Sequence, residues 1–105
     1  MPKFMLTYLG APKPKSPEDA QQMQHAYRAW LSELGPAAIS PMNPLKATEV
    51  IRSDLHVESG SATGMSGFTL LEAESLDSAR EIAKACPFLS AGGELELSEI
   101  VDMGS

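Results

Sequence analysis

The sequence predicts an α+β fold of the ferredoxin-like, split-βαβ type, with the element order β-α-β-β-α-β in one domain of residues 1–105. The last third of the chain carries the clearest observation. Residues 67–74 have the pattern of a strand, residues 75–86 that of a helix ended by Pro87, and residues 94–101 that of a second strand. A similar βαβ unit precedes this one, and right-handed crossovers place both helices on one face of a four-stranded antiparallel sheet.

The chain opens with a predicted strand at residues 3–9. Phe4, Leu6 and Tyr8 alternate with Met5, Thr7 and Leu9, so apolar side chains point to both faces. A central strand that is covered on both sides has this pattern. Residues 10–16 follow as a loop, in which two prolines remove backbone donors.

The first helix is predicted to run from Ser16 to about Leu34. Ser16 suits the N-cap position, and Gly35 suits the position after the last turn. An apolar stripe at helical spacing is expected to lie in the core. For Tyr27 and Trp30 the alternative is a ring at the edge of a pocket. The stripe consists of Met23, Tyr27, Trp30, Leu31 and Leu34.

The middle of the chain is predicted to contain a single strand, at residues 48–53. Residues 37–46 hold two prolines and are expected to be a connection rather than an element. Residues 56–67 hold three glycines and are expected to form a loose hairpin connection. Ser75 is the predicted N-cap of the second helix.

The composition argues against several classes of function. Fourteen acidic and eight basic residues give a net charge of −6. Phosphate backbones repel such a surface unless basic residues cluster, so no nucleic-acid partner is expected. No apolar run approaches the ~20 residues of a membrane span, and the first residues lack a signal-peptide pattern, so no membrane partner is expected. The single cysteine permits no internal disulfide and fits a cytoplasmic protein.

The distribution of side chains over the two faces of the sheet predicts a homodimer. The more apolar set is assigned to the helix side: Phe4, Leu6, Tyr8, Phe68, Leu70, Leu95, Leu97 and Val101. The opposite face receives Met5, Thr7, Leu9, Thr69, Leu71, Ala73, Glu94, Glu96, Ser98 and Ile100. This second set is too apolar to face water and too polar for a dry core. A second copy is therefore expected to cover it, so that two sheets enclose a partly wet cavity.

Several segments resemble the YCII-related proteins, a family of the dimeric α+β barrel superfamily. These segments are residues 3–8, 30–35, 67–79, 83–89 and 92–98. The resemblance covers nearly the whole chain and implies a ferredoxin-like domain that pairs into a dimer. It implies no particular reaction, because most of the family has no assigned one.

Some members of that family are proposed to use a histidine on the first helix with an aspartate before a proline at the end of the second. In this chain the residue before Pro87 is Cys86. The histidine position falls nearest Gln24, with His25 one residue away on the expected outer face. Where the resemblance implies a histidine after the Cys-Pro pair, the chain has Phe88. A His–Asp mechanism is therefore not carried over.

Polar side chains on the predicted cavity face are the candidate catalytic and ligand-binding residues. A carboxylate in a half-apolar cavity can act as a base, so Glu96 is the candidate catalytic residue. Thr7, Thr69 and Ser98 would orient a ligand on the same face. The competing interpretation of Glu96 is a solvated acid at the dimer seam.

Three further residues are candidates for ligand contact. Cys86 and Phe88 lie where the second helix ends, near the rim of the barrel, and a buried, inert cysteine is the competing interpretation. His56, paired with Asp54, either lines a pocket or lies exposed beside the glycine-rich loop. No metal site is expected, because neither histidine has a second ligand at metal-binding spacing. No cofactor is predicted.

Three functions are compatible with the sequence. The first is a small-molecule binding protein with its pocket inside a homodimer, which would use cofactor-free acid–base chemistry of lyase or isomerase type if it is catalytic. The second is a cofactor-independent monooxygenase-like enzyme, on fold analogy alone. The third is a non-catalytic regulatory or structural dimer module with a decayed site, an interpretation that Gln24, Cys86 and Phe88 favour.

Overall fold

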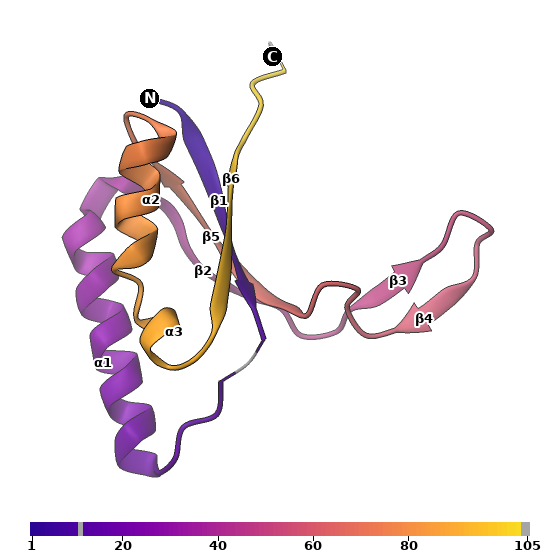
Figure 1. The fold of residues 1–105 in the computed structure, drawn as a ribbon, viewed down its shortest axis with the longest axis horizontal. Helices are drawn as coiled ribbons and strands as arrows, with labels where there is room; N and C mark the ends of the chain where they lie inside the picture. The colour runs from indigo at the N-terminus through magenta and orange to yellow at the C-terminus, as the bar shows by residue number, and fades with distance from the viewer. Residues whose placement is uncertain (11, 104–105) are drawn as a thin grey trace.

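The computed structural model describes residues 1–10 and 12–103, so residue 11 of the predicted loop lies outside the described residues. The elements in order are β1 (Lys3–Leu9), α1 (Pro17–Leu34), the 3-10 helix η1 (Gly35–Ala37), β2 (Ala38–Pro44), β3 (Glu49–Ile51), β4 (Val57–Ser59), β5 (Met65–Glu72), α2 (Leu76–Lys84), α3 (Pro87–Ser90) and β6 (Glu94–Glu99). The main sheet has four antiparallel strands in the order β2-β5-β1-β6. The helices α1, α2 and α3 lie on one face of it (Figure 1). The predicted α+β fold class is confirmed.

Both long helices begin where their capping residues predict. Ser16 Oγ accepts a hydrogen bond from the Asp19 amide at 3.0 Å at the start of α1. Ser75 Oγ accepts one from the Ser78 amide at 3.1 Å at the start of α2. Gly35 follows α1 with a positive φ of 54°, a conformation that glycine adopts at little cost.

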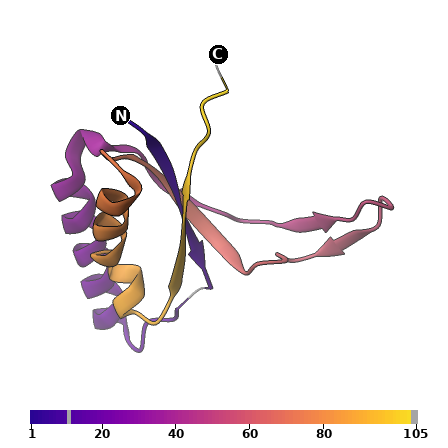
Figure 2. The same cartoon turned by 45° about the horizontal axis from the view of Figure 1, so that its top comes forward.

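The middle of the chain differs from the prediction in two ways. Residues 38–44, expected to be a connection, form strand β2 at the edge of the main sheet. Its prolines Pro41 and Pro44 are tolerated because an edge strand need not donate every backbone N–H to a neighbour. The predicted strand at residues 48–53 is shorter and pairs as β3 with β4 in a separate two-stranded hairpin. Figure 2 shows this hairpin projecting from the main sheet.

The face prediction is right for β1 and β6 and wrong for β5. Leu6 of β1 pairs with Thr69 of β5, and both side chains are fully buried on the helix side. Phe68 and Leu70, assigned to the helix side, therefore lie on the opposite face with Thr7 and Met5. Leu71 and Ala73 are likewise buried with the core. The physical reason is that β5 carries apolar residues on both faces, so its alternation does not distinguish them.

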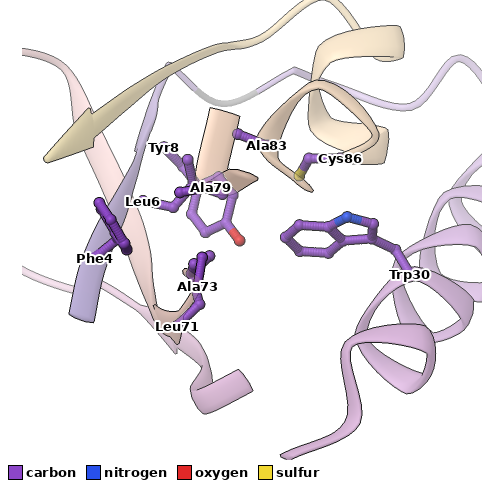
Figure 3. Packing of buried hydrophobic residues seen from close by; sticks show 9 residues of the cluster. All are labelled: Phe4, Leu6, Tyr8, Trp30, Leu71, Ala73, Ala79, Ala83 and Cys86. Atoms are coloured by element: carbon purple, nitrogen blue, oxygen red, sulfur yellow. The ribbon is translucent and has the colours of Figure 1, made fainter. Parts of the chain in front are cut away.

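The core lies between the sheet and the helices. Figure 3 shows the indole of Trp30, from α1, directed toward the side chains of β1, with Cys86 close to it. Trp30 Nε1 donates to the Ile82 carbonyl of α2 at 3.2 Å, which ties the two long helices together. The buried apolar residues are Phe4, Leu6, Tyr8, Trp30, Leu71, Ala73, Ala79, Ala83 and Cys86. The core position predicted for Trp30 is confirmed, whereas Tyr27 is half-buried at its edge.

The opposite face of the sheet has no helix over it in the part of the chain that is described (Figures 1 and 2). We call it the open face; its residues from β1, β5 and β6 are Lys3, Met5, Thr7, Leu9, Phe68, Leu70, Glu72, Glu94, Glu96 and Ser98. Val101, predicted on the helix side, lies beyond the end of β6 and is 74% exposed. Across residues 1–10 and 12–103, no helix is both long and apolar enough to cross a membrane.

Candidate functional site

A pocket of about 190 Å³ opens on the helix side of the sheet, between α1, α3 and one end of the strands. We call it the tyrosine pocket. It is lined by Tyr8, Tyr27, Met42, Asn43, Pro44, Ser66, Gly67 and Phe88. Among the residues that the structure describes, none that lines it is charged, and its exposed wall is almost wholly apolar. Such a wall favours an uncharged ligand, because a charge would lose its hydration without gaining a partner.

Three aromatic rings from three different elements form one wall of the pocket. The ring of Tyr8, from β1, lies 5.0 Å from that of Phe88, from α3, and 5.9 Å from that of Tyr27, from α1. The ring planes are tilted by 54° and 58°, an arrangement that aromatic pairs prefer over face-to-face stacking. In Figure 3 the Tyr8 ring points from the strand into the space between sheet and helices. The sheet and both helices therefore fix the positions of the rings jointly.

A short chain of hydrogen bonds orients the Tyr8 hydroxyl. Thr69 Oγ1 donates its only proton to the Pro41 carbonyl at 2.7 Å. The contact of 2.5 Å between Tyr8 Oη and Thr69 Oγ1 is therefore donated by Tyr8. This leaves the acceptor side of the Tyr8 oxygen for other groups, and Tyr27 interacts with it.

Burial keeps the polar groups of this cluster protonated. It raises the pKa of Tyr8 and of Tyr27 above that of an ordinary phenol, and it raises the pKa of the Cys86 thiol. Interactions of the thiol with the Phe88 backbone and with both tyrosine hydroxyls lower its pKa by less than burial raises it. At neutral pH these groups accordingly keep their protons, and the thiol is a poor nucleophile.

Two glycines leave the space that the pocket and its ring wall need. A Cβ on Gly67, which faces Tyr8 across the strands, would lie 3.0 Å from the Asn43 carbonyl oxygen. A Cβ on Gly93 would lie 2.2 Å from the ring of Phe88. Neither glycine has a positive φ, so what excludes a larger residue at each position is the approach of neighbouring atoms.

The predicted site residues fall into three separate places. Thr7 lies opposite Glu96 and Met5 opposite Ser98 on the open face, where Glu96 and Ser98 are exposed and Thr7 is buried between neighbours. Thr69, Cys86 and Phe88 lie on the helix side in or next to the tyrosine pocket. His56 is on the projecting hairpin, where its amide binds Asp54 Oδ1 at 2.9 Å. Of the four residues predicted to share the dimer cavity, Thr69 therefore lies on the other side of the sheet from Thr7, Glu96 and Ser98.

The sequence did not point to most of the residues that line the pocket. Asn43 and Pro44 lie in β2, a segment predicted to be a connection, and Ser66 precedes the predicted start of the next strand. The one usable signal was Gly67, a glycine that begins an apolar strand segment. Gln24 and His25, the positions nearest the family's helix histidine, are both exposed on α1.

Comparison with known proteins gives a family match and matches among solved structures. A family model described as the YCII-related domain matches residues 5–104. A solved structure of 5-chloro-2-hydroxyhydroquinone dehydrochlorinase (TftG) from Burkholderia phenoliruptrix AC1100, in complex with 2,5-dihydroxybenzoquinone, superposes with a TM-score of 0.52. The two chains are 19% identical, over 94% of this chain and 93% of that chain, so the likeness is one of fold. No curated protein matches the sequence. Within the described residues, no three His, Cys, Asp or Glu side chains are grouped so that they could hold a metal ion.

Proposed function

Because the chain belongs to the YCII-related domain family, we propose that it binds a small, uncharged organic molecule, about the size of one six-membered ring, in the tyrosine pocket. The observation that carries the proposal is a cavity of about 190 Å³ with an apolar, uncharged wall. An apolar cavity of ~150 Å³ is large enough to bind benzene, whereas drug-sized ligands need ~300 Å³ or more.

The groups that line the pocket determine which molecule would fit best. Tyr8, Tyr27 and Phe88 offer ring faces and edges to an aromatic or quinonoid ring. The Asn43 amide nitrogen is already engaged with the carbonyls of Ser40 and Phe68. Tyr8 already donates its proton to Thr69 Oγ1, so its oxygen can only accept a hydrogen bond from a ligand, which favours the hydroxyl of a phenol. The ligand of the dehydrochlorinase of similar fold is also a single ring.

Thermal-shift and titration measurements test this proposal. Phenol and hydroquinone should raise the melting temperature, whereas benzoate should not, because its carboxylate would be buried without a partner. Met42→Trp at the pocket mouth, where Met42 is 59% exposed, should weaken binding by about tenfold or more, equivalent to about 1.4 kcal/mol. Leu76→Trp, at an exposed position of α2, is the matched control and should bind as the wild type does. Equal binding by both variants would place the ligand elsewhere.

The open face supports the second part of the proposal, a homodimer. Its apolar side chains Met5, Leu9, Phe68 and Leu70 are only half-buried, and no described helix covers them. A second copy placed face to face would remove these side chains from water. It would also enclose Glu96 with Thr7 and Ser98, which lie on the same face.

Within such a pair, Glu96 remains the candidate base for acid–base chemistry of lyase or isomerase type. The carboxylate is exposed in the single chain, so the second copy would have to supply the enclosed surroundings. Glu96→Gln should abolish any turnover of a ring compound that binds, while the melting temperature and the affinity stay near the wild-type values. Full turnover in this variant would exclude Glu96, and no turnover in the wild type would favour the non-catalytic alternative.

A further inference from the structure

We infer that the hairpin of β3 and β4 binds a second copy of this chain, with Leu55 at its tip packed against the other copy; this rests on the proposed homodimer. We call residues 48–60 the arm. The amide of Gly60 donates to the Thr48 carbonyl at 2.8 Å, and β3 pairs with β4 in a sheet of its own. The arm is therefore a two-stranded element, a kind that is only marginally stable unless it packs on something.

The tip of the arm holds a leucine in a conformation that leucine avoids. Leu55 has a φ of 74°, the one positive φ among the described residues other than glycine. Its amide donates to the Arg52 carbonyl at 2.8 Å, so the turn fixes this conformation. The Leu55 side chain is 81% exposed, so no packing within the chain offsets the strain. A glycine would make the same turn without strain. We therefore expect the leucine side chain to pack against a group outside the chain, where burial would offset the strain.

Other exposed apolar side chains continue from the tip toward the main sheet. Twelve large apolar side chains of the described residues are exposed, and six of them lie between residues 39 and 57. These six are Ile39, Met42, Leu45, Ile51, Leu55 and Val57. Half of the exposed large apolar side chains of the described residues therefore come from one stretch of chain, which runs from the edge strand β2 into the arm.

The direction of the arm selects a second copy as the partner. Figures 1 and 2 show that the arm leaves the sheet on the side away from the three described helices. This is the side of the open face, whose half-buried Met5, Phe68 and Leu70 also lack a cover. In a two-fold pair, a copy that covers the open face comes within reach of the arm, and each arm meets the other copy. One dimer contact would then cover both the open face and the apolar side chains of the arm.

The charged side chains of the arm pair with one another, and its apolar side chains are left to make the contact. Arg52 binds Glu58 through two contacts, Nε to Oε1 at 3.2 Å and Nη2 to Oε2 at 3.1 Å. His56 Nε2 lies 3.9 Å from Glu58 Oε1 on the same hairpin. The Arg52–Glu58 pair joins the two sides of the hairpin, whereas His56 and Glu58 lie on the same side, before and within β4. Ile51, Leu55 and Val57 remain exposed and are the apolar groups offered to a partner.

Sedimentation equilibrium of the full chain tests the inference with Leu55→Gly. Glycine adopts the observed φ without strain, so this variant should keep or raise the melting temperature of the dissociated chain, measured at a concentration where the wild type is monomeric, while the dimer dissociation constant rises at least tenfold. Ile51→Ser with Val57→Ser should act in the same direction. Leu76→Ser, which removes an exposed leucine from α2 on the helix side, is the control and should dimerise like the wild type.

Each outcome decides a different point. If the arm variants dimerise like the wild type, the proposed contact of the arm is wrong and the proposed homodimer is unaffected. A wild type that stays monomeric overturns both, whereas ligand binding in the tyrosine pocket is judged by its own titration. Isotope-filtered nuclear Overhauser effects in a mixture of labelled and unlabelled chains give a second readout. Contacts from the Leu55 methyls to the other copy support the proposed contact of the arm, and their absence in a dimeric sample overturns it.

Discussion

Tyr8 has one proton to donate, and Thr69 accepts it because the proton of Thr69 is itself used on the Pro41 carbonyl. This order leaves the Tyr8 oxygen as an acceptor, and Tyr27, which also lines the pocket, interacts with it. A threonine that the sequence placed in a dimer cavity thus orients a tyrosine on the helix side instead. Burial keeps both Tyr8 and Tyr27 protonated, because it raises the pKa of each phenol.

The raised pKa values predict that stability falls at alkaline pH. The ordinary values are 9.0 for the Cys86 thiol and 10.0 for the phenols of Tyr8 and Tyr27, and all three are raised in the folded chain. Above about pH 9 the unfolded chain loses these protons first, so the folded state binds more protons. The stabilisation is complete below the unfolded pKa values and is lost as pH rises toward the folded ones.

Urea unfolding between about pH 7 and pH 11 measures this loss. Tyr27→Phe removes one of the three protons and should flatten the fall of the unfolding free energy by at most about 1.4 kcal/mol per pH unit above pH 10. The variant will also change the stability at pH 7, so the slope and not the level is the quantity to compare. Identical slopes in the two proteins would mean that the Tyr27 phenol ionises as readily in the folded chain as in the unfolded one.

Among the elements, those with strong local signals are where the sequence predicts them. Ser16 and Ser75 are N-caps in the structure because a side-chain oxygen at that position satisfies a free helix amide wherever the helix packs. Pro87, expected to end the second helix, also opens the short helix α3 and so directs Phe88 into the pocket wall. Local chemistry alone determined these features.

Elements whose form depends on a distant partner were not predicted. Three prolines, at positions 36, 41 and 44, lie in or next to β2 and restrict its backbone. The segment nevertheless forms a strand, because it pairs with β5 at the edge of the sheet. The faces of β5 follow from its register with β1, which its own apolar pattern does not contain. Because Asn43, Pro44, Ser66 and Gly67 belong to these two strands, the tyrosine pocket could not be located before the pairing was known.

For the whole molecule, the sheet separates two sites with different requirements. The tyrosine pocket is complete within one chain, whereas Glu96 and its neighbours on the open face become enclosed only if a second copy is present. The pocket mouth lies at Met42–Pro44 of β2, the strand that leads into the arm. A partner that holds the arm would therefore also hold the chain next to the pocket mouth.

Charge predicts how the proposed dimer should respond to salt. Each chain carries a net charge of −6, so two copies repel one another at low ionic strength. Glu94 and Glu96 point to the open face from β6, where a face-to-face pair brings acids of both copies closer together. Added salt screens this repulsion, since the Debye length falls from ~30 Å at 0.01 M to ~10 Å at 0.1 M. The dimer dissociation constant should accordingly fall as salt is raised.

Sedimentation at a series of salt concentrations checks this expectation, with variants that separate a local effect from net charge. Glu94→Gln with Glu96→Gln should tighten the dimer at low salt and flatten its salt dependence, because the removed charges lie on the paired face. Glu33→Gln with Glu18→Gln makes the same change in net charge on exposed positions of α1 and should have the smaller effect. Association that weakens as salt rises would contradict this expectation and would show that attractive ion pairs, such as ones made by Lys3 of the same face, outweigh the repulsion between the acids of β6.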